Sequence, residues 1–386
     1  MRASRRGAVA TVVVAGAALL AAAAPTAALA AVPAVAAGSD VDRPVRDARI
    51  SEASGLAVSP QHAGVLWTHD DSGNAPLLFA LARDGRTAGT LRLRGTADVD
   101  WEALASFRDA EGRALLAVGD LGDNRGDRRQ VEVDVVLEPA RVDAAVTSEA
   151  TPLLRLLLTY PDGPADAEAL LVDTSRRRMF VVTKGLFGGA VYVVPSTGWN
   201  GRTPRRPTVR SARLVRVGDV PVGLVTDGTV APGGSVLLRS YTAVAAFAPF
   251  PVEPGDAGLA PLASAGLPLQ RQGEGLALTP DGRAVLLSSE GAGEPVLRVA
   301  LTAPVRAALS TSGTAASTPA PSPSASASAS ASASHRSPAP AGAAAPAAGT
   351  GTADAGSGPS PLPWGALAVA AGIVGAIVIG TARSRR

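Results

Sequence analysis

The stretch Glu274-Gly-Leu-Ala-Leu-Thr-Pro-Asp-Gly-Arg-Ala-Val-Leu-Leu-Ser-Ser-Glu290 decides the fold of this chain. Two alternating apolar runs flank a Pro-Asp-Gly turn, which is the pattern of a β-hairpin with one buried face. Its opening phrase returns at intervals of 47 to 66 residues, as Glu52-Ala-Ser-Gly-Leu-Ala, Glu102-Ala-Leu-Ala, Glu168-Ala-Leu-Leu and the degenerate Asp227-Gly-Thr-Val. A hairpin unit that recurs in this way predicts a β-propeller.

Each copy is followed by apolar runs that we expect to form the next strands of a blade. These runs are Val65–His69, Leu77–Ala82, Ala114–Gly119, Val131–Leu137, Met179–Thr183, Ala190–Val194, Ser235–Arg239, Val244–Phe247 and Pro295–Leu301. No window here sustains a capped helical period, so residues 45–305 are predicted to be all-β. We expect one propeller of five to six four-stranded blades, closed by an outer strand at Val45–Ile50. Residues 140–155 and 197–213 could hold extra strands.

The two ends of the chain carry export and anchoring signals. Residues 1–30 combine a basic start, an apolar run and Ala28-Leu-Ala30, which predicts a signal peptide followed by a leader at 31–44. Trp364–Thr381 is apolar throughout and precedes Arg383, Arg385 and Arg386, which predicts a transmembrane helix at 362–382 with a cytoplasmic tail at 383–386. A buried core helix is the alternative. The prediction is a single-pass protein of the cell membrane with an extracellular N-terminal domain.

Composition narrows the class of protein further. Residues 306–361 are almost entirely Ala, Ser, Pro, Gly and Thr, which predicts a disordered tether. The chain has no cysteine, so disulfides and thiolate metal sites are excluded. Without the arginines at 2, 5, 6, 383, 385 and 386, it holds 30 basic and 33 acidic residues, a formal charge of −3. The basic excess is therefore a membrane-topology signal, and nucleic acid is not an expected partner.

The repeats place acidic residues where a propeller converges on its axis. The innermost strand of each blade lines the channel, so the first residues of the copies should form one ring: Glu52, Glu102, Glu168, Asp227 and Glu274. The ends of the next strands should form a second ring: Asp70, Asp120, Lys184, Arg239 and Glu290. Lys184 is the only lysine of the chain, which marks it for a specific role.

Two interpretations of these rings stay open. The acids could hold a divalent cation, with Ca²⁺ as the cofactor candidate, and an anionic or polyhydroxylated ligand. Alternatively, each could accept hydrogen bonds from the backbone of a neighbouring blade. Two loops, residues 69–74 and 119–125, break the repeat and place Asp, Asn and Gly together. Asp120, Asp123, Asn124, Glu274 and Glu290 are the metal-ligand candidates, although such residues are also common in tight turns.

Other chemistries have little support. There is no Gly-x-Ser-x-Gly elbow, no phosphate-binding Gly-Lys-Ser/Thr loop and no dinucleotide fingerprint. The histidines are His62, His69 and His335, and no marked nucleophile accompanies them.

Several phrases stand out along the chain: the Glu-x-x-Gly-Leu-Ala opening, the Asp-Ser-Gly turn, the Asp98-Val-Asp-Trp-Glu-Ala-Leu-Ala105 run, and the closing Glu-Gly-Leu-Ala, Pro-Asp-Gly and Ser-Glu-Gly phrases. Together these phrases resemble secreted bacterial propellers. The group includes phytase-like esterases, regucalcin and gluconolactonase lactonases, and SdiA-regulated propellers. The resemblance covers residues 48–301. It implies an inward Glu, at Glu52, Glu102 or Glu274, that holds a metal together with Asp70, Asp120 or Asn124. Lys184 and Arg239 stand where the lactonases have an inner Asn, a departure that favours an anionic ligand.

Two functions follow as predictions. The first is a membrane-anchored, monomeric propeller that binds a cell-surface or cell-wall component, or an anionic small molecule. Glu52, Glu168, Asp227 and Asp70 would line its channel. The second is a divalent-metal-dependent hydrolase of phosphoesters or lactones, in which Glu102 takes the proton of the attacking water and Lys184 and Arg239 hold the negative charge of the substrate.

Overall fold

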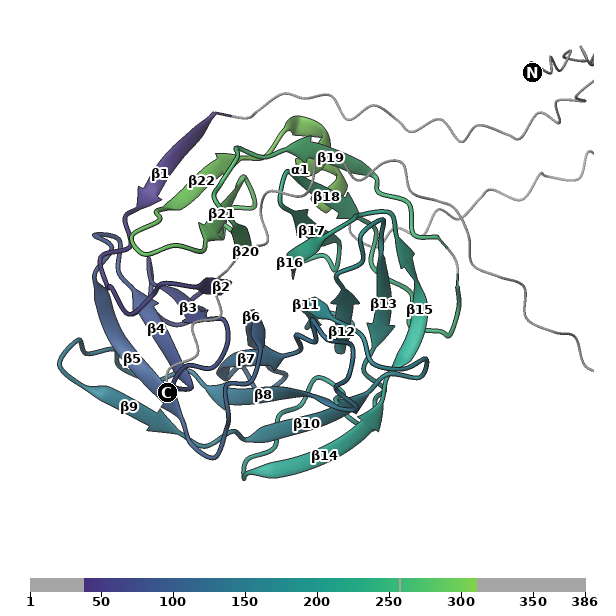
Figure 1. Cartoon of the computed structure of the whole chain (residues 1–386), viewed down its shortest axis with the longest axis horizontal. Helices are drawn as coiled ribbons and strands as arrows, with labels where there is room; N and C mark the ends of the chain where they lie inside the picture. Colours follow the sequence, from purple (N-terminus) through teal and green to yellow (C-terminus); the bar gives the residue numbers. More distant parts are fainter. Residues whose placement is uncertain (1–37, 257, 311–386) are drawn as a thin grey trace, which may run out of the picture. The chain divides into compact units, whose positions relative to one another are not determined.

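The recurring hairpins build the inner halves of five blades arranged in a ring. The computed structural model describes residues 38–310 except 257, and within them the strands form five sheets. Figure 1 shows the inner strands β2, β6, β11, β16 and β20 around the centre of the ring. The predicted all-β propeller is therefore confirmed, with five blades.

The elements divide among the blades in chain order. Blade 1 contains β2 (Ala53–Val58), β3 (Leu66–Asp70), β4 (Leu77–Leu81), β5 (Thr87–Leu93) and β9 (Thr147–Ala150). Blade 2 contains β6 (Trp101–Arg108), β7 (Ala114–Asp120), β8 (Val131–Leu137), β10 (Leu154–Thr159) and β14 (Thr208–Arg213). Blade 3 contains β11 (Ala167–Asp173), β12 (Arg178–Thr183), β13 (Gly189–Val193) and β15 (Val215–Val220). Blade 4 contains β16 (Val225–Val230), β17 (Val236–Ser240), β18 (Ala243–Phe247) and β19 (Ala263–Gly266). Blade 5 contains β20 (Gly273–Leu278), β21 (Ala284–Ser289), β22 (Val296–Ala300) and β1 (Ser39–Arg43).

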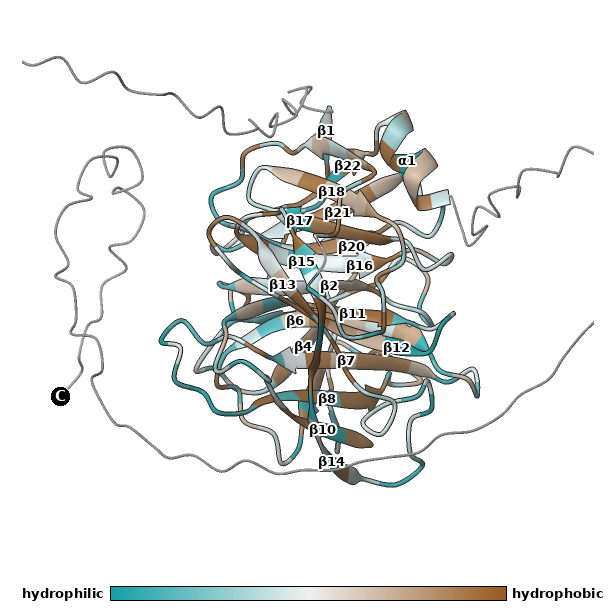
Figure 2. Ribbon diagram, turned by 90° about the vertical axis from the view of Figure 1, so that its right-hand side faces the viewer, coloured by the Kyte–Doolittle hydropathy of each residue, from teal (hydrophilic) through white to brown (hydrophobic). Residues whose placement is uncertain are grey.

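The hydrophobic core consists of five seams, each between two neighbouring blades. For example, one cluster joins Trp67 of blade 1 to Trp101 of blade 2, and another joins Phe180 of blade 3 to Phe247 of blade 4. The middle strand β7 is buried along its whole length because both of its faces meet other blades. In Figure 2 the strands are largely apolar and the loops at their ends are polar. Because every seam needs two blades, no blade can bury its faces alone.

The ring closes through the N-terminal strand. β1 pairs antiparallel with β22, with Ser39 opposite Val299 and Asp40 opposite Arg298. The prediction that Val45–Ile50 closes the ring is wrong. Val45 and Ile50 instead pack into the seam between blades 5 and 1. The closing strand has little apolar pattern, since Val41 is 61% exposed, and backbone pairing with an open edge fixes it.

Most second and third strands were predicted to within one residue, whereas the outer strands were not. The suspected extra strands exist as β9 and β14, and both run parallel to their neighbours. Helix α1 (Ala303–Ser310) was not predicted. Val305, Ala308 and Leu309 of α1 complete the seam between blades 4 and 5, so residues 306–310, assigned to the tether from sequence, belong to the folded core.

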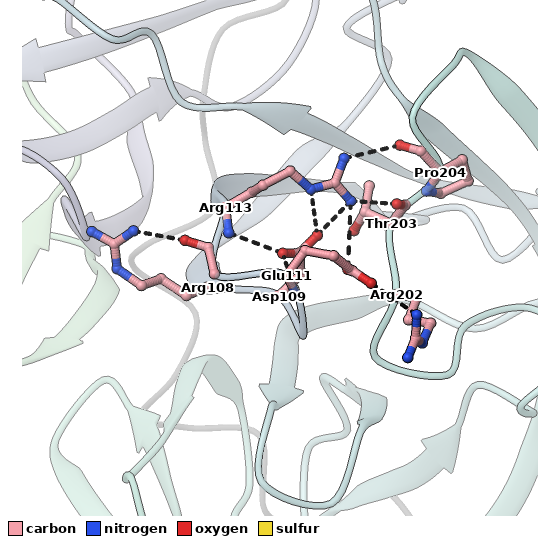
Figure 3. Close-up of polar contacts among 8 residues, drawn as sticks. Arg108, Asp109, Glu111, Arg113, Arg202, Thr203 and Pro204 are labelled. Atoms are coloured by element: carbon pink, nitrogen blue, oxygen red, sulfur yellow. Dashed lines mark hydrogen bonds and ion pairs between the residues drawn. The ribbon is translucent and has the colours of Figure 1, made fainter.

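A polar network at the β6–β7 turn shows how loops join blades (Figure 3). The Asp109 side chain is fully buried and pairs with Arg113 at 2.5 Å. Arg113 also donates hydrogen bonds to the carbonyl groups of Thr203 and Pro204. The turn of blade 2 is thereby tied to the long connection that leaves β13.

Several predictions lie outside the described residues: the signal peptide, the tether beyond Ser310, the transmembrane helix and the cytoplasmic tail. Within residues 38–310, no helix is long and apolar enough to cross a membrane.

Removing β1 should weaken the whole fold. Arg43 is 2% exposed and donates hydrogen bonds to Leu81 O at 2.8 Å and to Gly64 O at 3.0 Å, which links β1 to blade 1. We expect a fragment of residues 44–310 to melt about 5–10 °C below one of residues 38–310, because one buried and one part-buried hydrogen bond and a strand pairing are lost. Differential scanning calorimetry measures this. Val41→Ala in the longer fragment is the control, and equal melting temperatures of the two fragments would contradict the assigned role of β1.

Candidate functional site

Both predicted rings lie at the end of the ring of blades where the inner strands begin. In each hairpin the first residue of the inner strand pairs with a residue at the end of the second strand, as Ala53 does with Asp70 and Trp101 with Asp120. Neighbouring inner strands contact one another around the whole ring, from β2 through β6, β11, β16 and β20 back to β2. Acidic residues from different blades therefore converge at this end.

The centre of the site is a group of three carboxyl groups. Asp71 follows β3, Asp100 precedes β6, and Glu102 lies within β6. One carboxylate oxygen of each lies within 4.8 Å of the others. A Cβ added to Gly122 would stand 2.4 Å from Asp100 Oδ2 and 2.8 Å from Glu102 Oε1, so a glycine is needed to leave this space open. We call Asp71, Asp100 and Glu102 the acidic cluster.

Unpartnered oxygens lie within the acidic cluster and beside it. Among the described residues, buried carboxylate oxygens without a hydrogen-bond partner include Asp71 Oδ1, Asp98 Oδ1, Glu168 Oε2 and Glu274 Oε2. Glu168 is 1% exposed and Glu274 is 2% exposed. A buried acceptor without a donor costs free energy, and such a group in a native fold points to a ligand, a water or an ion. The site is therefore built to accept donors or cations.

Lys184 neutralises one side of the site. Its ammonium group forms an ion pair with Glu168, and its Nζ lies 5.5 Å from the ring centroid of Tyr241. Burial opposes the charge of this lysine, but Glu168 and Glu274 outweigh that effect and raise its pKa. Tyr241 approaches Glu274 Oε1 at 3.4 Å. The single lysine of the chain is thus held charged between carboxylates.

Burial and mutual repulsion raise the pKa values of the acids. Burial, followed by the charges of Asp100 and Glu290, raises the pKa of Asp71 to about 8. Burial also raises the pKa of Asp98 to about 7. Burial and then the charge of Glu274 raise the pKa of Glu290 to about 7. Burial and then Glu168 raise the pKa of Glu102 well above its usual value. Carboxyl groups in this state ionise readily when a cation replaces their protons.

The donor set fits a hard divalent cation. The cluster offers three carboxylate groups and no nitrogen or sulfur ligand, as Ca²⁺, Mg²⁺ and Mn²⁺ prefer. Glu102 Oε2 is held by the Ser54 hydroxyl at 3.1 Å, which leaves Oε1 facing Asp100 and Gly122. Asp71, Asp100 and Glu102 would therefore be the protein ligands of such an ion.

Two residues of the predicted rings, one a channel candidate and one a catalytic candidate, form links between blades. Asp227 accepts hydrogen bonds from Leu276 N at 2.6 Å and Gly228 N at 2.7 Å, which joins blade 4 to blade 5. Arg239 is fully buried and donates to the carbonyl oxygens of Gly275 and Ser288. For these two positions the structural interpretation describes the contacts better than a ligand role.

The acids predicted in the two loops also have partners in the protein. Asp70 accepts hydrogen bonds from Ser51 N and Glu52 N, both at 3.0 Å. Asp120 pairs with Arg128 at 2.7 Å, and Asp123 accepts from Asp127 N and Arg128 N. These oxygens shape the turns.

The remaining predicted residues lie at the margin of the site. Glu52 and Asn74 are exposed and in contact at 3.4 Å, and Asn124 is exposed. Glu290 accepts a hydrogen bond from Gln272 Nε2 at 2.5 Å.

Sequence reasoning missed Asp71, Asp98, Asp100 and Tyr241 as site residues. Three of them were visible, because Asp71 lies in the 69–74 loop and the other two aspartates immediately precede the second copy of the repeat. Asp71 lies in the β3–β4 loop within blade 1, and Asp98 and Asp100 lie in the connection from blade 1 to blade 2. The repeated phrase itself gave no reason to choose them.

A cavity of 630 Å³ lies at the opposite end, where the inner strands finish. It is lined by the ends of the inner strands together with Arg306, Leu309 and Ser310 of α1. It is separate from the acidic cluster, since none of the three acids lines it.

Comparison with known proteins finds only distant structural similarity. No family model matches the chain, and no curated protein matches it. Among solved structures, a glutaminyl cyclase from Myxococcus xanthus is 14% identical, with 70% of this chain and 100% of that chain covered and a TM-score of 0.40. A gluconolactonase from Xanthomonas campestris is 15% identical, with 70% and 97% covered and a TM-score of 0.34. A pyrroloquinoline-quinone-bound aldose sugar dehydrogenase from Streptomyces coelicolor is 12% identical, with 70% and 99% covered and a TM-score of 0.39.

The class that the fold and site define is a five-bladed β-propeller with an acidic cluster at the start of its inner strands. The β-propeller architecture that the sequence resemblance implies is confirmed by the five sheets of the structure. At such identities and TM-scores, the solved structures carry no argument about activity.

The metal-free protein should lose stability as the pH rises from 5 to 8. A carboxyl group whose pKa is raised on folding stabilises fully below its unfolded pKa of about 4, and this contribution is lost as the pH rises through the folded value. The folded pKa is about 8 for Asp71 and about 7 for Asp98 and Glu290. The melting temperature of residues 38–310 in a chelator should therefore fall across this window, and less steeply in Asp71→Asn. The exposed Asp84→Asn variant is the control, and a flat or rising profile would contradict the assigned pKa values.

Proposed function

We propose that this protein is a membrane-anchored extracellular binding module whose acidic cluster holds a divalent cation and presents it to a ligand at the cell surface. The observation that carries the proposal is the convergence of Asp71, Asp100 and Glu102 within 4.8 Å. The unpartnered buried oxygens of Glu168 and Glu274 support it, because they offer acceptor positions beside that cluster. Ca²⁺ is the first candidate ion, since it accepts several carboxylate and carbonyl oxygens.

The contacts of the two basic side chains at the site, Lys184 and Arg239, favour binding over hydrolysis. A hydrolase of phosphoesters would need free positive charge to hold its substrate. Arg239 is fully buried and engaged with backbone carbonyl groups, and Lys184 is paired with Glu168. Anion-holding capacity at this site is therefore small without a bound metal ion. The membrane location remains a proposal that rests on the sequence of residues 362–386.

Divalent cations should bind residues 38–310 at a single site, and affinity should increase as the pH rises toward 8 because binding displaces protons. Isothermal titration with Ca²⁺, Mg²⁺ and Mn²⁺ after chelation measures this. Asp71→Asn should weaken binding about tenfold or more, because one of three charged ligands is lost. Asp84→Asn removes an equal charge from an exposed site on blade 1 and should leave the affinity unchanged.

Gly122→Ala provides a steric test that removes no charge. The added methyl group would stand 2.4 Å from Asp100 Oδ2, so cation binding should fall as it does in Asp71→Asn. Gly258→Ala is the matched control, because a Cβ there meets no atom within 4 Å. Unaltered cation binding in both Gly122→Ala and Asp71→Asn would refute the proposed site.

Metal-assisted hydrolysis is the second candidate, favoured by the carboxyl groups around the cluster whose pKa values lie near neutrality. Asp98, with a pKa of about 7 and an unpartnered Oδ1, could take a proton from an attacking water. If so, a screen of phosphoesters and lactones with saturating Ca²⁺ or Mn²⁺ should find turnover that Asp98→Asn lowers about 100-fold or more. Turnover that is unchanged in this variant, or absent with every ester and lactone, would leave binding as the function.

A further inference from the structure

One region of the chain is strongly basic although the remainder is not. Residues 174–213 contain eight arginines and Lys184, and they contain no aspartate or glutamate. Lys184 belongs to the acidic end of the molecule, but the arginines fall mainly in two loops that begin in blade 3. These are the β11–β12 turn and the connection from β13 to β14.

The fold brings these two loops together with the β6–β7 turn of blade 2. A Cβ on Gly201 would lie 2.6 Å from Arg177 Cγ, so Arg177 packs across the connection that leaves β13. Ala110 N donates a hydrogen bond to Gly201 O at 3.2 Å, and Arg202 pairs with Glu111 at 3.0 Å. Figure 3 shows Arg108, Arg113 and Arg202 around this junction.

The charge of this junction is predominantly positive at the surface. Its exposed arginines, here called the arginine surface, are Arg108, Arg177, Arg202, Arg205 and Arg206. The acids beside them are engaged: the Asp109 side chain is fully buried against Arg113, and Glu111 pairs with Arg202. Within residues 38–310, Arg177, Arg205 and Arg206 form no ion pair, so three guanidinium groups are free to meet an anionic partner.

The arginine surface lies at the same end of the propeller as helix α1. The β11–β12 turn adjoins the β16–β17 turn, where a Cβ on Gly234 would lie 3.3 Å from Ser175 Oγ. The β16–β17 turn in turn contacts α1, since Ser235 donates a hydrogen bond to Ala308 O at 3.3 Å. These turns join the ends of inner strands to the starts of second strands, so they lie opposite the acidic cluster.

We propose that the arginine surface docks on a membrane surface that contains anionic phospholipids. Arginine binds phosphate through two parallel hydrogen bonds, and basic groups beside an anionic leaflet are attracted electrostatically. The described chain ends at Ser310 of α1, on this side of the propeller, and the sequence beyond it includes the apolar stretch Trp364–Thr381. The free guanidinium groups of the arginine surface would set the orientation, because they lie on the side of the propeller opposite the acidic cluster.

This docking would hold the acidic cluster away from the bilayer, where a ligand outside the cell can reach it. The inference does not depend on cation binding by that cluster. The arginine surface and the acidic cluster share no residue, and each can be changed without the other.

Vesicle co-sedimentation of residues 38–310 tests the proposal. This fragment contains the closed ring and all five seams of the core. The probes are vesicles of phosphatidylcholine alone and vesicles that also contain phosphatidylglycerol. We expect binding only to the second kind, and weaker binding as NaCl rises from about 50 to about 300 mM. Each basic residue near an anionic surface strengthens binding about fivefold, so Arg177→Glu/Arg205→Glu/Arg206→Glu should weaken it more than tenfold.

A second triple variant controls for net charge. Arg125→Glu/Arg129→Glu/Arg271→Glu changes the same charge at exposed positions in loops at the acidic end, and it should bind nearly as the unaltered fragment does. Circular dichroism verifies that both variants are folded. Equal weakening by the two variants, or equal binding to neutral vesicles, would overturn the proposal. Binding to double-stranded DNA as tight as to the anionic vesicles would also overturn it, and would indicate a general polyanion surface.

Discussion

The structure depends on one constraint, which is that each blade can bury its apolar faces only against the blades beside it. All five hydrophobic clusters span two blades, so the core exists only when the ring is closed. Closure joins strands from the two ends of the domain, because β1 completes the sheet of β20, β21 and β22. Helix α1 then fills the seam between blades 4 and 5. Both terminal elements therefore stabilise the whole ring as well as the blades that they touch.

Ring closure also creates the candidate site. Equivalent positions of five blades meet at the axis, so a repeated acid becomes a concentration of negative charge in a buried place. The protein resolves this in different ways at different blades. Asp227 is satisfied by two backbone amides, Glu168 is paired with Lys184, and Asp71, Asp100 and Glu102 remain together with raised pKa values. The repeat supplies the charge, and the departures from the repeat decide where a cation could bind.

The second and third strands of the blades could be predicted from sequence because their burial imposes a pattern on every residue. β8 matches its predicted bounds, Val131–Leu137, and β7 exceeds its predicted bounds by one residue. The outer strands are held by backbone pairing with the edge of a sheet and need no apolar pattern. For example, β14 alternates between exposed and half-buried residues with no clear apolar face. In the site, the sequence alone placed the repeated acids near the axis. It did not predict which groups hydrogen-bond or pair with Asp70 and Asp120. A carboxylate in a turn has the same sequence signature whether it accepts backbone amides or faces the channel.

The sequence by itself determined that the domain is a propeller, which strands line its axis and that acids converge there. These properties follow from a repeat and its alternation, which are local along the chain. Only the tertiary structure decided which strand closes the ring, which acids keep unpartnered oxygens and which arginines gather on one surface. Asp71 follows β3 of blade 1 and Asp100 precedes β6 of blade 2, whereas Arg108 ends β6 and Arg177 lies in the β11–β12 turn of blade 3. Their proximity is set by the packing of one blade on the next, and no local pattern in the chain encodes it.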